Sequence, residues 1–502
     1  MRPNVVILAA GLGTRMRSRR AKVLHELAGR PLIAHVVRAA LGAHPSRLIV
    51  VIGHQAEDVR RIVEREVARN AGEPSPRLLF ALQHEPLGTG HAALMALETL
   101  GAEEGPPHAP TAVAESEALE QWEKWEEAPV WREPLVLLYG DMPRVRSETI
   151  ARLVAAHLEG RAVATLMTLR LEDPTGYGRI VRDAQGEVVR IVEETEARPE
   201  ERAIQEVNAG LYCFDPKPLL GALRRLRPEN RKGEYYLTDV VGVLTSIGYR
   251  VRAIESEHPE ELLGVNTRED LARLEAELRR EICARWMREG VTIRDPNTTW
   301  IDADVVIGAD TVLHPYVHLE GETRLGEACE VHAWTRIVDS QLGDRVIVRN
   351  FTVIQGSRIG NDVRIGPFAH LRGEVELADE VAIGNFVEVK KSRIGRRSKA
   401  MHLAYLGDAT VGERVNVGAG TITCNYDGKR KHPTIIEDDV KLGSDTMLVA
   451  PVRVGRGAMT GAGAVVIRDV PERTLVVGVP AVEKKKVEEE SAPEPSASLP
   501  AD

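Results

Sequence analysis

The chain has 502 residues, of which 43% are hydrophobic and 28% charged, and its formal net charge is −9. At roughly 100–200 residues per domain this length predicts two or three domains. The acidic balance argues against a nucleic-acid-binding protein with a dominant basic surface. The four cysteines (Cys213, Cys283, Cys329 and Cys424) are scattered and form no CxxC pair, which favours a reducing compartment such as the cytoplasm over a disulfide framework or a zinc site. No run of about 18 apolar residues occurs, so we expect no membrane span.

Residues 1–265 alternate short apolar runs with amphipathic segments. The runs at 5–11, 47–54, 134–141 and 163–169 are typical of strands, and residues 30–41 have the pattern of a helix. This alternation predicts βαβ units, with a largely parallel sheet and helices on both faces. Ligands bind beyond the carboxyl ends of such strands, where we expect a Gly-rich loop at Gly11 and the carboxylate of Asp141.

Two segments depart from this rhythm. Residues 103–133 hold nine acidic residues, two basic ones and three of the six tryptophans. We interpret them as a surface insertion, with a partner-docking segment anchored by Trp122 and Trp125 as the alternative. Residues 266–290 have a helical pattern with charges on one face, and we expect a helical arm there.

Aliphatic residues recur every six positions beyond residue 300. A period of six fits neither a helix nor an alternating strand, and it is the signature of a parallel β-helix in which each hexapeptide supplies one short strand. We therefore predict an all-β hexapeptide-repeat domain over 291–483, followed by a charged, Pro/Ser-rich disordered tail at 484–502. The repeating positions are Ile307, Leu313, Leu319, Leu325, Val331 and Ile337, then Ile359, Ile365, Leu371, Leu377, Ile383 and Val389, then Leu442, Leu448, Val454, Thr460 and Val466.

A Gly-rich loop follows the first predicted strand. Gly11 and Gly13 allow the backbone to approach a phosphate, and loop N–H groups can hold anionic oxygens. Arg15 and Lys22 can neutralise phosphate charge. A dinucleotide site would require a third glycine where this chain has Met16. A tight turn that binds no ligand remains an alternative to a phosphate site at this point.

The loop and several further motifs occur together in one known family. LAAGLGTRM, LQHEPLGTGHA, VLLYGDMP, DPTGYGRI, EVNAGLY, GEYYLTD and GVNTR resemble, in this order, the bifunctional N-acetylglucosamine-1-phosphate uridyltransferase/glucosamine-1-phosphate acetyltransferases. The resemblance covers nearly the whole chain apart from 103–133 and the tail. It implies an α/β Rossmann-like nucleotidyltransferase domain and a left-handed parallel β-helix. It also implies a cytoplasmic homotrimer that makes UDP-N-acetylglucosamine for cell-wall and lipopolysaccharide synthesis.

The resemblance also implies a first active site, in which the sugar phosphate attacks the α-phosphorus of UTP and releases pyrophosphate. Arg15 and Lys22 are the implied catalytic residues, although the family usually has Pro where this chain has Ala21. Asp141 and Asn266 are the implied Mg²⁺ ligands, and two oxygens with substrate phosphates and waters suit this small, hard cation. The implied binding residues for UTP and the N-acetylglucosamine moiety are Leu8, Ala9, Ala10, Gly11, Lys22, Gln83, Gly88, Thr89, Tyr139, Gly140, Asp141, Gly178, Glu193, Asn208 and Asn266.

We expect a second active site after Val389, where a basic, His-containing loop replaces the regular hexapeptide repeat. MHLAYLGD and VGAGTITCNYDG match the acetyltransferase domain of the same family. By resemblance, His402 is the general base for an amine that attacks the thioester of acetyl-CoA, and we expect Glu388 to orient it. Direct transfer needs no acyl-cysteine at Cys424. The implied glucosamine-1-phosphate residues are Arg372, Lys390, Tyr405, Asn416 and Lys431, and the implied acetyl-CoA residues are Ala419, Asn425, Tyr426, Ser444 and Ala462.

Two other functions stay open on sequence grounds. One is a single-activity nucleotidyltransferase, of the ADP-glucose or dTDP-glucose type, with a purely structural or regulatory β-helix. The other is a catalytically silent relative that acts as an assembly subunit. His402 and the Asn425-Tyr426 pair argue against the first function. The second function is disfavoured by the intact Arg15, Lys22, Asp141 and Asn266.

Overall fold

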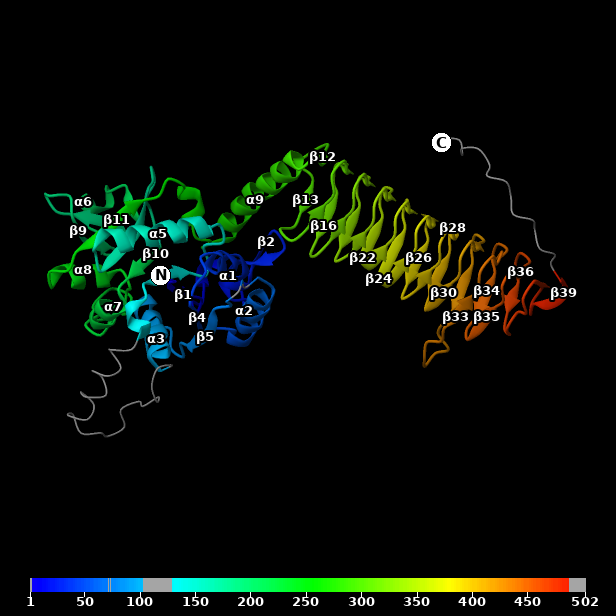
Figure 1. Ribbon diagram of the computed structural model, residues 1–502, viewed down its shortest axis with the longest axis horizontal. Helices are drawn as coiled ribbons and strands as arrows, with labels where there is room; N and C mark the ends of the chain where they lie inside the picture. The colour runs from blue at the N-terminus through cyan, green and yellow to red at the C-terminus, as the bar shows by residue number, and fades with distance from the viewer. Residues whose placement is uncertain (1, 71, 73, 103–128, 487–502) are drawn as a thin grey trace, which may run out of the picture. The chain divides into compact units, whose positions relative to one another are not determined.

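The computed structural model describes residues 2–70, 72, 74–102 and 129–486 (Figure 1), and the chain divides into two compact units, Met1–Leu274 and Glu275–Asp502. Most of the predicted insertion, including Trp122 and Trp125, lies outside the described residues, as does the tail beyond Lys486.

The first unit is built on a sheet whose nine described strands include the four runs expected from the sequence. The central order is β11-β7-β10-β6-β1-β4-β5, with β8 and β9 attached to β10. The strands are β1 (Asn4–Leu8), β4 (Arg47–Ile52), β5 (Arg77–Leu82), β6 (Leu135–Tyr139), β7 (Ala164–Arg170), β8 (Arg179–Arg182), β9 (Val188–Val192), β10 (Glu206–Phe214) and β11 (Val251–Glu255). A two-stranded ribbon, β2 (Glu26–Leu27) and β3 (Arg30–Pro31), lies apart from this sheet.

The sheet is mixed rather than largely parallel, which corrects the sequence-based expectation. β1, β4, β5 and β6 run parallel, but β10 is antiparallel to both of its neighbours, β6 and β7. The chain passes from β9 into β10 through the single short helix α6 (Pro199–Arg202). Hydrophobic runs look alike in both directions, so the sequence pattern could not reveal the reversal.

Helices cover both faces of this sheet, because successive side chains of each strand point to opposite sides. Val5 and Ile7 of β1 belong to a core with α1, α2 and α5. Val6 and Leu8 belong to a second core with α3, α7 and α8. Each fully buried aliphatic side chain contributes about 1.5–3 kcal/mol to stability. The helices are α1 (Leu32–Gly42), α2 (Ala56–Asn70), α3 (Thr89–Ala102), α5 (Ser147–Gly160), α7 (Pro216–Leu223) and α8 (Asp239–Ser246), with 3-10 turns at Thr14–Met16, Lys22–Leu24, Pro129–Arg132 and Pro259–Leu262.

The predicted arm is one helix, α9 (Arg268–Arg288). Glu269 and Asp270 lie in its first turn, and Arg285 and Arg288 lie in its last. This distribution complements the helix dipole, positive at the amino end and negative at the carboxyl end.

The second unit is a parallel β-helix, as the hexapeptide period predicts. Through most of this unit register partners lie 17 or 18 residues apart, for example Leu313 with Val331, and Val331 with Val348. Three hexapeptides therefore form one coil, with an occasional five-residue step, and the coils stack along a common axis (Figure 1). The repeating side chains fill the interior, as shown by Leu319 and Leu371, which are fully buried.

Two long sheets and one short sheet make up this unit. The first long sheet contains β12 (Thr292–Ile293), β15 (Val312–Leu313), β18 (Glu330–Val331), β21 (Ile347–Val348), β23 (Arg364–Ile365), β25 (Ala382–Asn385), β28 (Lys399–His402) and β31 (Asn416–Val417). The second contains β13 (Trp300–Ile301), β14 (Val306–Ile307), β16 (His318–Glu320), β17 (Arg324–Leu325), β19 (Arg336–Val338), β20 (Gln341–Leu342), β22 (Val353–Ile359), β24 (His370–Leu377), β26 (Glu388–Lys390), β27 (Arg393–Ile394), β29 (Tyr405–Gly407), β30 (Ala409–Val411), β32 (Ile422–Cys424), β33 (Thr434–Ile436), β34 (Met447–Val449), β35 (Val452–Val454) and β37 (Val465–Val466). The short sheet contains β36 (Met459–Thr460), β38 (Thr474–Val477) and β39 (Val482–Lys486).

The expectation that a loop replaces the repeats after Val389 is wrong. The coils continue through β27–β31 to β32, and the excursion from the coil occupies 425–433. Ala400 and Thr423 are buried in positions that aliphatic residues fill elsewhere, which hid the repeat. The Thr423 hydroxyl accepts from Gly407 N (2.8 Å), so a polar side chain is satisfied inside the coil. The predicted tail also starts too early, because Lys484–Lys486 lie in β39.

None of the described helices is long and apolar enough to cross a membrane.

Candidate functional site

The first cluster of predicted residues lies at the carboxyl ends of β1 and β6. Leu8 is the register partner of Tyr139, and Gly140 N donates to Leu8 O (2.9 Å). The loops that begin at Gly11 and Asp141 therefore leave the sheet side by side.

Gly13 allows Lys22 to pack against the Gly-rich loop. Gly13 has a φ of +61°, and a Cβ there would lie 2.5 Å from the Cβ of Lys22. Only glycine combines this backbone conformation with so close an approach.

Lys22 joins the two predicted magnesium ligands. Its ammonium group contacts the Asp141 carboxylate and lies 3.3 Å from Asn266 Oδ1, to which Arg15 Nη2 also donates (2.8 Å). Val265 N donates to Asp141 O (2.9 Å), which ties the two ligand segments together. The Asp141 and Asn266 side-chain oxygens both contact the Lys22 ammonium, so they lie close enough together to bind one divalent cation. Mg²⁺ prefers oxygen ligands of this kind. The donor set fits the metal.

A second part of this site surrounds Gln83. Its side-chain nitrogen donates to Gly88 O (3.1 Å), and the amide itself is buried. Thr89 Oγ1 accepts from Leu237 N (3.0 Å). A Cβ on Gly88, whose φ is +107°, would lie 2.6 Å from Tyr235 O. The predicted nucleotide residues Gln83, Gly88 and Thr89 are thus brought together and held against the 235–237 segment.

The predicted sugar residues form a third part. Asn208 N donates to Gly178 O (2.8 Å), and the Asn208 amide donates to the Tyr212 hydroxyl (2.6 Å). Glu193 accepts from the Thr238 hydroxyl (2.8 Å). Burial, with the charge of Glu193, raises the pKa of Tyr139, so its phenol remains a hydrogen-bond donor.

In the second unit, His402 is exposed at the end of β28. The register pairs it with Asn385 at the end of β25, and its Nδ1 lies 2.8 Å from Asn385 Oδ1. An amide oxygen only accepts, so Nδ1 donates in this contact, and in the neutral tautomer that this contact selects Nε2 is the nitrogen with the free lone pair. The expectation that Glu388 orients this histidine is wrong, because Glu388 pairs with Arg372 (3.0 Å).

Predicted phosphate-binding cations gather beside this histidine's coil. Arg372 and Lys390 follow the paired residues Leu371 and Val389 on adjacent coils. Contact with the Lys431 ammonium lowers the pKa of Lys390, and the charge of Arg372 adds to this effect. Three cations held this close are typical of an anion-binding surface.

Tyr405 and Asn425 form the polar part of the same region. The buried Asn425 amide donates to Asp408 Oδ2 (2.5 Å) and lies 3.4 Å from the Tyr405 hydroxyl. Tyr426 is exposed, and it belongs to the 425–433 excursion together with Lys431.

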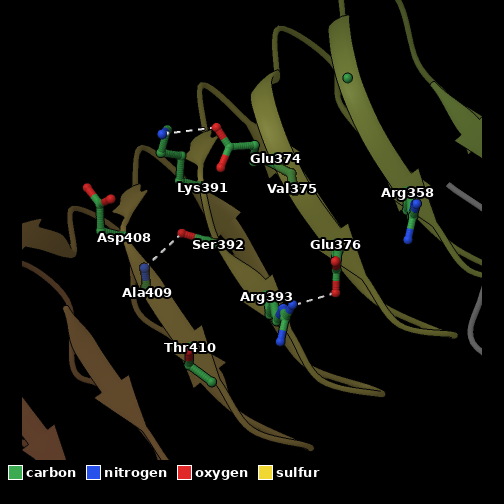
Figure 2. A pocket seen from close by; sticks show the side chains of 11 residues that line it. Arg358, Glu374, Val375, Glu376, Lys391, Ser392, Arg393, Asp408, Ala409 and Thr410 are labelled. Carbon is green, nitrogen blue, oxygen red and sulfur yellow. Dashed lines mark hydrogen bonds and ion pairs between the residues drawn. The ribbon is translucent and has the colours of Figure 1, made fainter. Parts of the chain in front are cut away.

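A groove of about 620 Å³ lies next to this region. Figure 2 shows Asp408 at one side of it and charged pairs along its wall, with Lys391 on Glu374 (2.9 Å) and Arg393 on Glu376 (3.0 Å). Asp408 therefore contributes both to the groove and to the Asn425 contact.

The predicted acetyl-CoA residues continue the column that contains His402. Lys399 pairs with Asn416, Asn416 with Lys441 and Lys441 with Met459. The residues three positions after these four partners are therefore aligned as well. His402, which follows Lys399 by three, lies in line with three small side chains on the next coils. These are Ala419, Ser444 and Ala462.

Sequence reasoning missed several residues whose side chains contact predicted site residues, among them Asp408, Thr238, Tyr212 and Asn385. Asp408 and Thr238 lie within motifs already quoted, so the motifs themselves could have indicated them. Asn385 stands 17 residues, or one coil, before His402, and only the coil length could have revealed it.

These features define a class: a sheet-based nucleotidyltransferase unit followed by a hexapeptide-repeat transferase unit. Residues 5–231 match the family model "MobA-like NTP transferase domain", and residues 356–391 match "Bacterial transferase hexapeptide (six repeats)". The "Bifunctional protein GlmU" of Heliobacterium modesticaldum is 44% identical over 472 residues, covering 94% of each chain. The protein of the same name from Carboxydothermus hydrogenoformans is 44% identical, over 94% of this chain and 96% of the relative. That from Syntrophomonas wolfei is 42% identical, over 95% of this chain and 97% of the relative. The chain belongs to the family of the bifunctional GlmU proteins, which confirms the resemblance found in the sequence.

Proposed function

We propose that the chain acetylates glucosamine-1-phosphate in its β-helix and then joins the product to UMP in its sheet unit. Acetyl-CoA supplies the acetyl group, UTP supplies UMP, and pyrophosphate leaves. The observation that carries this proposal is the presence of two separate clusters in one chain. One surrounds Lys22 and Asp141, and the other surrounds His402.

In the first reaction, His402 acts as the general base. The sugar amine attacks the thioester carbon, its proton passes to Nε2 of the imidazole, and the thiolate of coenzyme A leaves. The imidazole then returns a proton to that thiolate, so charges and atoms balance. A positioned base of this kind contributes about 10²–10⁴-fold to the rate. Arg372, Lys390 and Lys431 would hold the phosphate of the sugar.

The column beyond His402 supports the acetyl-CoA site. Coils stack about 4.8 Å apart, so three coils span roughly 14 Å. Ala419, Ser444 and Ala462 have small side chains, which leave space for a thin, extended ligand whose reactive end lies beside the imidazole.

In the second reaction, Lys22 and Arg15 would neutralise the triphosphate while the sugar phosphate attacks in line. The protein's contribution is mainly positioning and charge neutralisation. We propose that Asp141 and Asn266 hold Mg²⁺, which when bound supplies further positive charge at the phosphate oxygens. Tyr139 would donate from its protonated phenol toward the same region, and Glu193 and Asn208 would accept and donate to the sugar.

We also propose a homotrimer, supported by an exposed aromatic stripe on the β-helix. Tyr316, Trp334, Phe351, Phe368 and Phe386 stack in sequence, with centroid separations of 4.1–6.4 Å. Each is 41–54% exposed in the single chain. Leu403, beside His402, is 61% exposed, so a partner chain on this stripe would reach the acetyl-transfer site.

The trimer is tested by replacing Phe351 and Phe368 with Ser and measuring mass by sedimentation. We expect the variant to dissociate, while Tyr249→Ser, an equally exposed aromatic in the first unit, stays assembled. A wild-type protein that sediments as a monomer would contradict the proposal.

We further propose a cytoplasmic location. All four cysteines are free, and three of them are buried, which suits a reducing compartment.

The proposed function is tested by supplying purified chain with Mg²⁺, UTP, acetyl-CoA and glucosamine-1-phosphate. Free thiol and pyrophosphate should appear in equal amounts. Omitting acetyl-CoA should stop both, and adding N-acetylglucosamine-1-phosphate should restore pyrophosphate alone. Pyrophosphate release without any thiol would favour the single-activity nucleotidyltransferase.

A further inference from the structure

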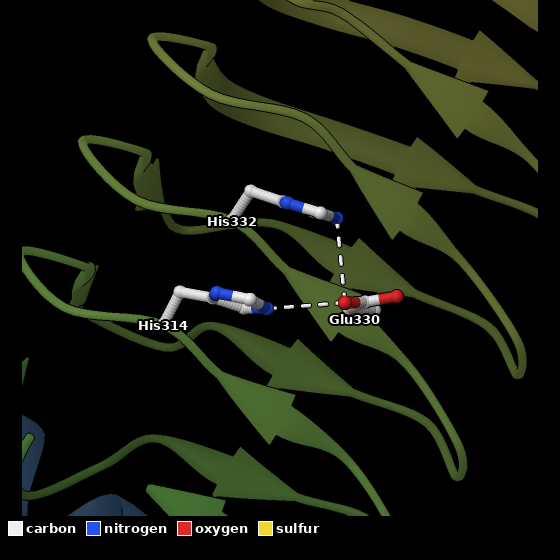
Figure 3. A group of neighbouring side chains, drawn as sticks. All are labelled: His314, Glu330 and His332. Atoms are coloured by element: carbon white, nitrogen blue, oxygen red, sulfur yellow. Dashed lines mark hydrogen bonds and ion pairs between the residues drawn. The ribbon is translucent and has the colours of Figure 1, made fainter. Parts of the chain in front are cut away.

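Two histidines and a glutamate converge near the start of the β-helix, several coils before His402. His314 and His332 follow strands β15 and β18 at the same point of adjacent coils, and Glu330 lies in β18. The imidazoles stack at 4.6 Å with an angle of 10° between their planes. Figure 3 shows both rings directing Nε2 toward one oxygen of Glu330, at 3.0 Å from His314 and 3.5 Å from His332.

The chemistry of these three groups is that of a metal donor set. Their ligand atoms all lie within 4.8 Å of one another, and all three side chains are partly buried. Bonds of about 2.0–2.2 Å to Zn²⁺ place tetrahedral ligands roughly 3.3–3.6 Å apart. Small rotations of the two imidazoles would reach this spacing. A repeating coil requires only a polar or charged side chain at such outward positions, so the fold itself does not demand this combination.

We propose that His314, Glu330 and His332 bind one divalent transition-metal ion of the zinc class. Two imidazole nitrogens and one carboxylate oxygen would ligate it, with water completing the shell. Mg²⁺ and Ca²⁺ are poor ions for this site, because they prefer oxygen ligands. The ion would link two adjacent coils and stabilise the start of the β-helix, whether or not either transfer reaction occurs.

The proposal is tested by titrating ZnCl₂ into the chelator-treated, full-length protein, with excess Mg²⁺ present to saturate the Asp141–Asn266 position. Isothermal calorimetry should show one Zn²⁺ per chain at the cluster. Co²⁺ should give the visible absorption of a low-symmetry site with nitrogen ligands. His314→Ala, His332→Ala and Glu330→Gln should each weaken binding by about tenfold or more, since even outer partners of metal ligands cost 10–100-fold.

His318→Ala is the matched control. His318 lies on the same part of the β-helix beside one carboxylate, Glu320 (4.0 Å), and stacks on Trp300 rather than on another histidine. The His318→Ala variant should bind Zn²⁺ as the wild-type protein does. Unchanged melting temperatures of the metal-free variants would show that they fold. Zn²⁺ binding in the His314→Ala/His332→Ala double variant equal to that of wild type, or no binding in wild type, would overturn the proposal.

Discussion

The imidazole Nδ1 of His402 lies 2.8 Å from the side-chain oxygen of Asn385. The two residues are register partners on adjacent coils, so the length of one coil sets their contact. A neutral amide rather than a carboxylate therefore orients the proposed general base.

Changing Asn385 should alter acetyl transfer in a way that reports on this contact. Asn385→Ala should lower kcat by roughly 10–100-fold, a part of the 10²–10⁴-fold that a general base contributes. Asn385→Asp should keep the geometry but place a negative charge that favours the protonated imidazole. The acid limb of the kcat/KM profile should then move to higher pH.

A thiol-release assay between pH 5 and 9 measures both effects. Asn350→Ala is the control, since Asn350 precedes Phe351 as Asn385 precedes Phe386 and should leave the rate unchanged. An Asn385→Asp profile that superimposes on that of wild type would mean that Asn385 has only a structural role.

Lys22→Met should disable the first unit alone. The ammonium lies between Asp141 and Asn266, so its loss removes charge where the triphosphate is expected to bind. Removing one such stabilising group costs about 10²–10³-fold in rate. Pyrophosphate release should fall by this factor while thiol release stays at its wild-type rate. Lys217→Met, at an exposed lysine of the same unit, should affect neither rate, and an equal fall in both reactions would exclude the assigned role.

Removal of divalent cations should separate the two activities. Asp141 and Asn266 form the proposed Mg²⁺ site, whereas the described residues around His402 include no group of three or more His, Cys, Asp or Glu side chains placed to hold a metal ion. EDTA should abolish pyrophosphate release and leave thiol release unchanged. Added Mg²⁺ should restore pyrophosphate release. A chelator-resistant release of pyrophosphate would argue against the metal.

Asp239→Asn should make the pH dependence of stability smaller. Burial, with the charges of Glu193 and Glu196, raises the pKa of Asp239 to about 6. Between about pH 4 and 6 the native carboxyl keeps a proton that the unfolded chain loses, so stability falls as pH rises through this window. The free energy of unfolding of Asp239→Asn should therefore exceed that of wild type at pH 8, and the two should be nearly equal at pH 4.

Urea unfolding of the first unit at these two pH values provides the measurement. Glu148→Gln, an exposed carboxylate in the first turn of α5, should show a much smaller change with pH. The same gain for Asp239→Asn at pH 4 and pH 8 would disprove the explanation.

The sequence predicted the two architectures well because buried apolar residues recur along the chain at a regular spacing. Leu371 and Ile383 are buried at six-residue multiples, and this spacing identifies the coil. The pattern failed at Ala400 and Thr423, where a small side chain and a hydrogen-bonded hydroxyl fill core positions that the aliphatic signal does not mark.

The contacts of the candidate sites were harder to predict than their residues. The motifs indicated His402 and Lys22, but Asn385 and Thr238 approach their partners only through coil stacking and sheet topology. Glu388 is nearer to His402 in sequence than Asn385 is, yet it pairs with Arg372. Proximity along the chain does not report neighbours across a β-helix.

The central claim is that two independent active sites share one polypeptide. It is tested most directly by measuring both reactions in His402→Ala and Asp141→Ala, with thiol release from glucosamine-1-phosphate and pyrophosphate release from N-acetylglucosamine-1-phosphate. His402→Ala should lose only thiol release, and Asp141→Ala should lose only pyrophosphate release. Either substitution silencing both reactions in a folded, assembled protein would contradict the account.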